Sequence, residues 1–206
     1  MFVEDYMSRE PITIEESAPL ADAAALMVKQ QFRQLPVLDE GARLSGIITD
    51  RDIRETVGFG EPLRDNLVVS DLMTANPVTI SLDATMDDVV RVLAENRFGS
   101  LPVVWADRLV GIITYMDVLR AFSEVFGLDK PGKRIEVALP GGYADLSRAF
   151  GALKSCNGTV LAAVISRTRR DGGEPALYLR VEHNQARNIE KRLRDATLIL
   201  LEPEHT

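Results

Sequence analysis

The chain has 206 residues, of which 46% are hydrophobic and 27% are charged, and its formal net charge is −7. This composition can form a hydrophobic core, and the length allows one large domain or two modest ones. The negative charge disfavours nucleic acid or an anionic membrane as the main partner.

Sequence signals of export and of a structural metal are missing. No apolar run of 18 residues occurs, and residues 1–9 lack the basic start and apolar centre of a signal peptide. The single cysteine, Cys156, excludes an internal disulfide, and the two histidines do not form a zinc pattern with it. We therefore expect a cytoplasmic protein without a metal site.

An internal repeat occupies the first part of the chain. Two segments match at an offset of 66 residues, and the matched pairs include Asp5 and Asp71, Met7 and Met73, Pro11 and Pro77, and Leu35 and Leu101. Beyond residue 44 the offset falls to 65, so the first copy has one extra residue in the loop near 39–44. Such a difference at a loop tip is typical of a duplicated domain.

The first two elements of each copy are an extended segment and a helix. The extended segments are Pro11–Ile14 and Pro77–Ile80. The helices have apolar residues at the i, i+3, i+4, i+7 spacing of one buried face. These residues are Leu20, Ala23, Ala24 and Met27 in the first copy and Met86, Val89, Val90 and Leu93 in the second. Thr85 and Asp88 have the spacing of a capping box.

Two strands and a closing helix complete each copy. We predict strands at 35–38 and 44–49 in the first copy and at 101–104 and 109–114 in the second. The closing helices are expected to start near Asp52 and Asp117. Each copy is thus a β-α-β-β-α unit of mixed α/β class. One unit cannot cover its own sheet, so we expect the two copies to pack face to face.

The second strand of each copy runs into a duplicated motif, Gly46–Asp52 (GIITDRD) and Gly111–Asp117 (GIITYMD). In each motif a threonine precedes an aspartate by three residues at a strand-to-helix junction. The hydroxyl can hydrogen-bond a phosphate, the carboxylate can accept from a sugar diol, and the helix N–H groups can hold an anion. Alternatively, each aspartate only caps its helix.

The L-P-V strand and the G-I-I-T-x-x-D motif, both doubled, resemble a pair of cystathionine β-synthase (CBS) domains over about residues 3–122. The resemblance implies a pseudo-twofold pair with two clefts for adenine-containing ligands such as AMP, ADP, ATP or S-adenosylmethionine. By position, Asp52 and Asp117 would accept from the ribose, and Thr49 and Thr114 would lie near the phosphates. The residues implied around the base are Thr13, Ile14, Pro36, Thr79, Ile80 and Pro102.

The two copies differ inside the motif. The first has Asp50-Arg51 where the second has Tyr115-Met116. Arg51, together with Arg33 just before the first L-P-V strand, could bind a phosphate at the first site. Alternatively, both arginines are ordinary surface residues. We therefore expect the two sites to be unequal, with Asp50 and Arg51 as candidates at the first site alone.

After a breaker-rich linker at 127–132, residues 133–206 form a second domain. Strands are predicted at 134–139, 159–166, 175–181 and 197–201. One helix is predicted between the turn at Pro140-Gly141-Gly142 and the stop at Asn157-Gly158, and another near 185–194. The first of these helices is expected to bury Leu146, Ala149, Phe150 and Leu153. Asp171-Gly172-Gly173 predicts a hairpin turn. The order β-α-β-β-α-β is the split ferredoxin-like order.

This second domain resembles ACT domains, which are small-molecule regulatory modules that often bind amino acids. Ala138 stands where ACT domains often have an aspartate before the Pro-Gly turn. Pairing with another subunit is therefore an alternative role for this domain, beside the binding of an amino acid. The resemblances divide the chain into a CBS pair at 1–126, with repeats at 3–58 and 69–124, and an ACT-like domain at 133–206. This domain order resembles that of bacterial acetoin-utilisation proteins.

These patterns favour a regulatory homodimer that senses an adenine nucleotide and is not an enzyme. No nucleophile–base pair, metal cluster or phosphate loop is visible, so we expect no catalytic cofactor. One alternative is a partner-binding dimer with empty CBS clefts. Another is a regulatory subunit of a separately encoded enzyme.

Overall fold

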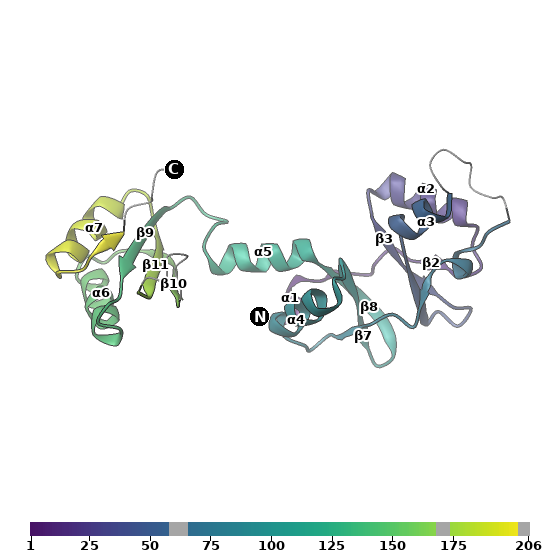
Figure 1. The fold of residues 1–206 in the computed structure, drawn as a ribbon, viewed down its shortest axis with the longest axis horizontal. Helices are drawn as coiled ribbons and strands as arrows, with labels where there is room; N and C mark the ends of the chain where they lie inside the picture. The colour runs from purple at the N-terminus through teal and green to yellow at the C-terminus, as the bar shows by residue number, and fades with distance from the viewer. Residues whose placement is uncertain (58–65, 168–173, 202–206) are drawn as a thin grey trace. The chain divides into compact units, whose positions relative to one another are not determined.

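The structure, a computed structural model, describes residues 1–57, 66–167 and 174–201. It consists of two compact units, Met1–Leu119 and Arg120–Thr206. The division falls within helix α5, Tyr115–Val125. Figure 1 labels the main helices and strands of both units.

The first unit contains two repeats with the predicted β-α-β-β-α order. The first repeat consists of β2 (Ile14–Glu15), α2 (Leu20–Gln30), β3 (Gln34–Leu38), β4 (Leu44–Thr49) and α3 (Asp50–Val57). The second consists of β6 (Ile80–Ser81), α4 (Met86–Asn96), β7 (Ser100–Trp105), β8 (Arg108–Thr114) and α5. Short elements precede each repeat, namely α1 (Val3–Tyr6) and β1 (Ser8–Arg9) before the first and the 3-10 helix η1 (Val69–Asp71) and β5 (Thr74–Ala75) before the second.

The repeats exchange their leading strands. One sheet has the strand order β2-β3-β4-β5 and the other has the order β1-β8-β7-β6. Ala75 of β5, which leads into the second repeat, pairs with Gly46 of the first. Ser8 of β1, which leads into the first repeat, pairs with Ile112 of the second. Each repeat therefore supplies an edge strand to the sheet of the other.

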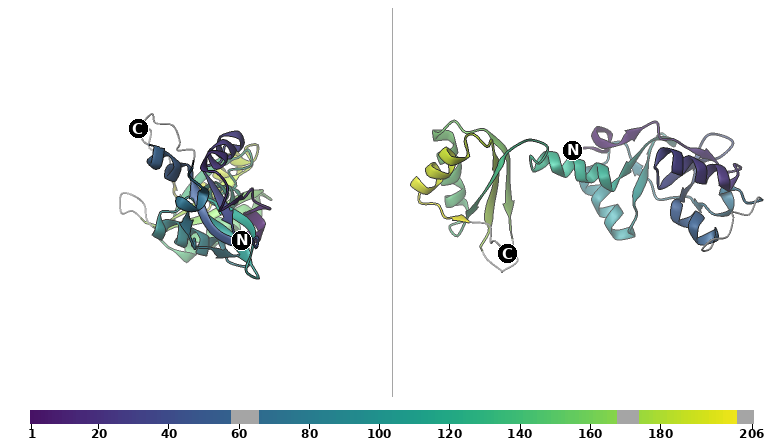
Figure 2. Two further views of the ribbon diagram at one scale, coloured as in Figure 1. Left: turned by 90° about the vertical axis from the view of Figure 1, so that its right-hand side faces the viewer. Right: turned by 90° about the horizontal axis from the view of Figure 1, so that it is seen from above.

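The predicted helical faces form the cores of the repeats. Leu20, Ala23 and Met27 of α2 are buried in one cluster with residues of β3 and β4, while Ala24 is only half-buried. Helices α2 and α3 lie side by side (Figure 2). In the second repeat the corresponding residues of α4, which are Met86, Val89 and Leu93, are also buried, and Val90 is half-buried.

The predicted extended segments at 11–14 and 77–80 lead into two short strands. Strand β2 begins only at Ile14, which pairs in parallel with Val37, and β6 begins only at Ile80. Of each predicted extended segment, only the last residue lies in a strand. Each predicted segment begins with a proline, Pro11 or Pro77, which cannot donate a hydrogen bond to a ladder.

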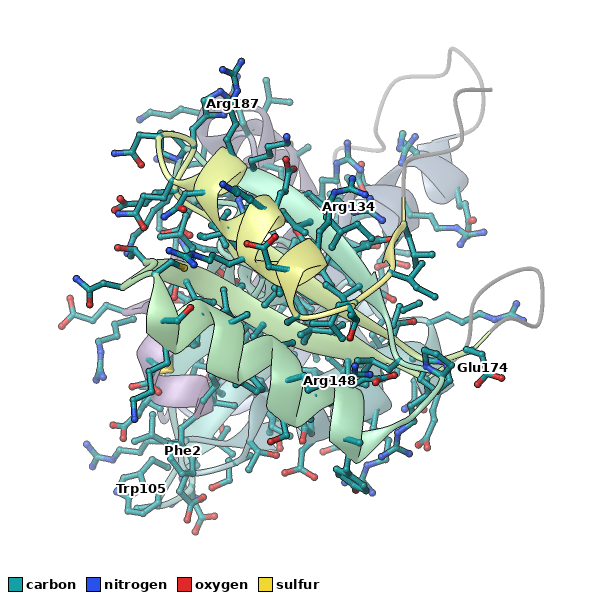
Figure 3. The ribbon with its side chains drawn as sticks, turned by 90° about the vertical axis from the view of Figure 1, so that its left-hand side faces the viewer. Phe2, Trp105, Arg134, Arg148, Glu174 and Arg187 are labelled. Carbon is teal, nitrogen blue, oxygen red and sulfur yellow. The ribbon has the colours of Figure 1, made fainter. Side chains whose placement is uncertain are left out.

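The second unit is a four-stranded antiparallel sheet with the order β10-β11-β9-β12. Its elements are β9 (Lys133–Ala138), α6 (Tyr143–Ser155), β10 (Val160–Ser166), β11 (Ala176–Val181), α7 (Ala186–Asp195) and β12 (Leu200–Leu201). Figure 3 shows α6 and α7 in front of the sheet, and apolar residues of both helices share one core with β9 and β11. The predicted turn at Asp171-Gly172-Gly173 lies outside the described residues.

Two predictions for this unit were wrong in detail. Ala149 and Leu153 are buried as expected, but the side chain of Phe150 is 46% exposed. Small Ala149 lies at the centre of the buried face, and Phe150 falls at its margin because adjacent helical residues are about 100° apart. The last strand begins at Leu200 and not at Thr197, where a left-handed φ of 57° interrupts an extended chain.

The turn between β9 and α6 is held by a buried carboxylate. Asp145 is 2% exposed, and its Oδ2 accepts a 2.7 Å hydrogen bond from the Gly141 amide. Its Oδ1 pairs with Arg148, whose Nη1 also donates to Thr197 Oγ1 at 2.8 Å. The Arg148 bond and the Gly141 amide together hold the pKa of Asp145 below its usual value.

Candidate ligand site

The threonine and the aspartate of the first motif contact each other directly. Asp52 Oδ2 accepts hydrogen bonds from the Thr49 amide at 2.8 Å and from Thr49 Oγ1 at 2.7 Å. In return, the Asp52 amide donates to Thr49 Oγ1 at 3.2 Å. Thr49 ends β4 and α3 begins at Asp50, so this exchange is a capping box at the start of the helix.

The second motif repeats this geometry. Asp117 Oδ2 accepts from the amide and the hydroxyl of Thr114 at 2.8 and 2.7 Å, and the Asp117 amide lies 3.4 Å from Thr114 Oγ1. Asp117 is only 6% exposed, whereas Asp52 is half-buried. Because Asp117 is more enclosed, a ligand group beside its carboxylate would interact with it more strongly than the same group would with the carboxylate of Asp52.

The threonine hydroxyls have a clear structural role. A hydroxyl carries one proton, and in both motifs that proton is donated to the aspartate. Thr49 and Thr114 therefore orient the two carboxylates and offer a ligand only an oxygen acceptor in this arrangement. A place for these threonines near the phosphates stays a prediction.

The same capping geometry occurs at one site outside the duplicated motif. Asp88 Oδ2 accepts from Thr85 Oγ1 at 2.6 Å, and the Asp88 amide donates to Thr85 Oγ1 at 3.2 Å. The capping box predicted at the start of α4 is thus confirmed. The Thr85 bonds, with a smaller contribution from Arg91, hold the pKa of Asp88 below its usual value. A threonine and an aspartate three residues apart therefore establish a helix cap, and a ligand site needs further evidence.

The charged candidates of the first motif form ion pairs along α3. Arg51 Nε lies 2.8 Å from Glu55 Oε1, and its side chain is 78% exposed. The hydrogen bond and the charge of Glu55 raise the pKa of Arg51 above its ordinary value. Asp50 pairs with Arg54 at 3.1 Å. Arg33 is exposed, and its carbonyl accepts from the Asp50 amide at 2.9 Å.

The residues implied around the base lie on, or directly before, the first two strands of each repeat. Ile14 packs against the core of the first repeat, and Thr13 directly before it is half-buried. Pro36 is buried and lies opposite Ile47, two residues before Thr49. The second repeat has the same arrangement, with half-buried Thr79, buried Ile80, and buried Pro102 opposite Ile112. The strand pairing thus brings these segments together within each repeat.

Ser100 is a polar residue near the second motif that the sequence analysis did not single out. It is 4% exposed, and its Oγ has no hydrogen-bond partner among the described residues. Ser100 pairs with Thr114 across β7 and β8. Its counterpart in the first repeat is Gln34, which pairs with Thr49. The sequence did contain a signal for this position, because Ser100 has a small hydroxyl where the matching Gln34 has a long amide, beside an otherwise similar motif.

Metal ligation and membrane insertion find no support in the described part of the chain. Among those residues, no group of three or more His, Cys, Asp or Glu side chains could hold a metal ion. None of the described helices is long and apolar enough to cross a membrane.

Comparison with known families identifies the two repeats. The CBS domain model matches residues 3–58 and 69–124, which together make up more than half of the chain. The protein therefore belongs to the CBS domain family and contains a tandem CBS pair.

Two curated relatives match part of this chain. The chain is 31% identical to L-aspartate semialdehyde sulfurtransferase of Methanocaldococcus jannaschii over 59% of its own length, but it covers only 23% of that protein. It is 29% identical to the chloroplastic CBS domain-containing protein CBSX2 of Arabidopsis thaliana, over 54% of this chain and 58% of that one. The chain thus spans a minor part of the first relative and somewhat more than half of the second.

Solved structures of CBS pairs resemble the first part of the chain. CBSX2 in complex with AMP superposes with a TM-score of 0.55 at 29% identity, over 60% of this chain and 97% of that one. The CBS pair of MJ0100, in complex with 5′-methylthioadenosine and S-adenosylmethionine, gives 0.54 at 31% identity, over 60% and 96%. The acetoin utilization protein AcuB of Vibrio cholerae gives 0.55 at 29% identity, over 63% and 95%.

Proposed function

We propose that this protein is a regulatory sensor that binds an adenine nucleotide or a related adenosyl compound through its CBS pair. The observation that carries the proposal is the pair of Thr-x-x-Asp motifs, each fixed at the start of a helix that follows a strand. Related CBS pairs have been solved with AMP and with S-adenosylmethionine and methylthioadenosine. In the proposal Asp52 and Asp117 accept from ribose hydroxyls, and the helix N-termini favour a nearby phosphate.

The second unit serves this sensor as an ACT-type domain. Its β-α-β-β-α-β order and its strand order β10-β11-β9-β12 support a ferredoxin-like assignment. Asp145 anchors the turn before α6 through Gly141 and Arg148. We propose that this domain binds a second ligand or another subunit, and that the protein acts as a homodimer without catalytic activity.

A ligand screen by thermal unfolding tests the sensor. The pure protein is melted with AMP, ADP, ATP, NADH and S-adenosylmethionine in turn, and the fluorescence of the only tryptophan, Trp105, reports the CBS unit. A ligand that binds only the folded state, present at 100 times its Kd, adds about 2.7 kcal/mol to stability. If none of the five shifts the transition, the nucleotide proposal is wrong.

Three matched substitutions locate the site. Asp52→Asn and Asp117→Asn keep an oxygen that can accept the threonine hydrogen bond, but they remove the charge. Loss of a charged hydrogen bond to ribose should weaken binding by about tenfold to 150-fold. Asp88→Asn changes the same capping geometry outside the motif and should leave binding intact. Equal effects of all three would show that the carboxylates act through helix stability alone.

The second candidate function is a partner-binding dimer with no nucleotide. One observation favours it: Thr49 donates a hydrogen bond to Asp52 in the same way as Thr85, outside the motif, donates to Asp88. Under this alternative no adenosyl ligand shifts the melt, and the Asn variants change stability only slightly because asparagine also caps helices. Co-purification of an enzyme would then indicate a regulatory subunit.

A further inference from the structure

The sheet of the second unit has a charged face that points away from helices α6 and α7. The apolar residues of β9 and β11 belong to the core that the sheet shares with both helices. Because successive side chains of a strand point to opposite faces, the residues between them lie on the other face. These are Arg134 and Glu136 of β9 and Tyr178 and Arg180 of β11.

The two arginines of this face stand directly opposite each other. Arg134 pairs with Arg180 in the register of β9 and β11. Like charges at directly opposite positions destabilise an antiparallel pair. The charge of Arg134 is compensated, since it forms an ion pair with Glu136 and its guanidinium lies 5.5 Å from the centre of the Tyr178 ring. The charge of Arg180 is left.

Arg180 has a hydrogen-bond donor that the described residues do not satisfy. Its Nη2 donates to the carbonyl oxygen of Lys130 at 3.0 Å, but its Nε is buried and has no partner. In the described part of the chain no ion pair involves Arg180. A buried N–H without an acceptor is destabilising, and the guanidinium presents its donors in a fork that matches a carboxylate.

The segment that follows α5 covers this side chain. A β-carbon at Gly132 would lie 3.2 Å from Arg180 Cγ and 2.9 Å from the carbonyl oxygen of Val181, so this part of the chain lies close against β11. Lys130 is bonded to the far end of the same side chain. Residues 130–132 therefore run along Arg180, and Nε lies between the two contacts. Movement of this segment would open Nε to a ligand.

The neighbours of Arg180 on the third strand are small and apolar. Ala162 of β10 lies opposite Arg180, and Val164 lies opposite Tyr178. An anion at Arg180 would therefore have apolar side chains beside it, which suits an organic acid better than inorganic phosphate. One uncompensated positive charge likewise matches a monoanion, and the planar fork of arginine binds a carboxylate with two hydrogen bonds.

We propose, on the basis of the second ligand included in the proposed function, that Arg180 binds a small monocarboxylic acid with an apolar group. The carboxylate accepts from Nε and Nη2 of Arg180 and takes the place of the Lys130 carbonyl. The apolar group lies against Ala162 and Val164. Because residues 130–132 must leave Arg180 for this, the ligand also loosens the linker that precedes the second unit.

Titration of the full chain with sodium butyrate, followed by heteronuclear NMR, tests the site. The Nε–H resonance of Arg180 should shift and saturate with butyrate, but not with sodium chloride at the same ionic strength. Arg180→Lys keeps the charge and removes the fork, so it should weaken butyrate binding, read from the Ala162 and Val164 amides, by at least about tenfold. Arg187→Lys, at an exposed position of α7, is the matched control and should bind like the unchanged chain.

Three outcomes of this titration would overturn the proposal. They are the absence of a saturable shift with butyrate, equal affinity for sodium phosphate, and an unchanged affinity of the Arg180→Lys variant. L-leucine that shifts the melt of the second unit but leaves the Arg180 Nε–H resonance in place would support a second ligand and contradict this site.

Backbone dynamics test the displacement of the linker. The heteronuclear NOE of the Lys130 and Gly132 amides should fall when butyrate binds, because these residues lose their contact with Arg180. An unchanged or higher value would show that the segment stays in place and that the carboxylate does not replace the Lys130 carbonyl. Asp117→Asn, which changes the proposed nucleotide site, should leave the butyrate titration unchanged. Failure of nucleotide sensing and failure of the carboxylate site can thus be told apart.

Discussion

Met73 fills the space that a side chain at residue 46 would need. A β-carbon at Gly46 would lie 2.9 Å from Met73 Cγ and 3.2 Å from the carbonyl oxygen of Thr74. Gly111 stands in the same relation to Met7, and a β-carbon there would lie 2.9 Å from the carbonyl oxygen of Ser8. The glycine that opens each motif is therefore set by the strand exchanged from the other repeat.

Substitution of either motif glycine should destabilise the CBS unit. Gly46→Ala and Gly111→Ala force the exchanged strand and its methionine to move, and overpacking of this kind costs roughly 1–3 kcal/mol. Denaturant unfolding followed by Trp105 fluorescence measures the loss. Unchanged stability in both variants would mean that the exchanged strands are loosely held.

A glycine in a different setting should behave in the opposite way. Gly151 lies within α6, and a β-carbon there would meet nothing within 4 Å. Because glycine is less favourable than alanine in a helix by about 0.8–1.0 kcal/mol, Gly151→Ala should stabilise the second unit by roughly that amount. Circular dichroism during urea unfolding provides the measurement. A loss of stability would contradict the open environment of this residue.

The threonines of the motif should affect both stability and binding. Thr49→Val and Thr114→Val remove the hydroxyl that caps the helix and orients the aspartate, and each should cost about 0.5–2 kcal/mol. Thr85→Val removes the equivalent cap of α4 and should cost a similar amount. Isothermal titration with the ligand found in the screen should show weaker binding for the first two variants alone. Equal affinities in all three would remove the threonines from the site.

The buried carboxylate of the second unit should make its stability depend on acid pH. The pKa of Asp145 is lowered in the folded chain by Arg148 and the Gly141 amide, so the ionised form favours folding. This contribution is present above the unfolded pKa, near 3.8, and is lost as the pH falls through the lower folded value. Asp145→Asn should therefore lower stability at neutral pH and flatten the acid side of the stability curve measured by circular dichroism. An unchanged slope between pH 5 and the acid transition would contradict this assignment.

The sequence predicted the repeated architecture well because duplication supplied an internal comparison. The strands that end at Thr49 and Thr114 and the helix with its cap at Thr85 follow from local patterns. The motif residues were placed together for the same reason, since a spacing of three across a strand-to-helix junction leaves little freedom. Residue roles within the ligand site, by contrast, are still predictions.

Features that depend on neighbours distant in sequence could not be predicted. No local pattern shows that β1 and β5 pair with the sheet of the opposite repeat. Phe150 lies at the margin of the buried face of α6, and how wide that face is depends on what packs against the helix, which the spacing of apolar residues does not report. The ion pair of Arg51 with Glu55 is a local i, i+4 contact that the sequence analysis did not name, and a contact of Arg51 with a phosphate stays a prediction.

The exchange of β1 and β5 has a consequence for the origin of the protein. A polypeptide with one repeat would leave its own sheet one strand short and would carry a leading strand without a sheet. Two such chains could satisfy both needs by swapping those strands. We therefore expect that the ancestor was a strand-swapped dimer of single repeats and that gene fusion joined its halves. Once fused, the copies no longer had to remain identical, and Asp50-Arg51 could diverge from Tyr115-Met116.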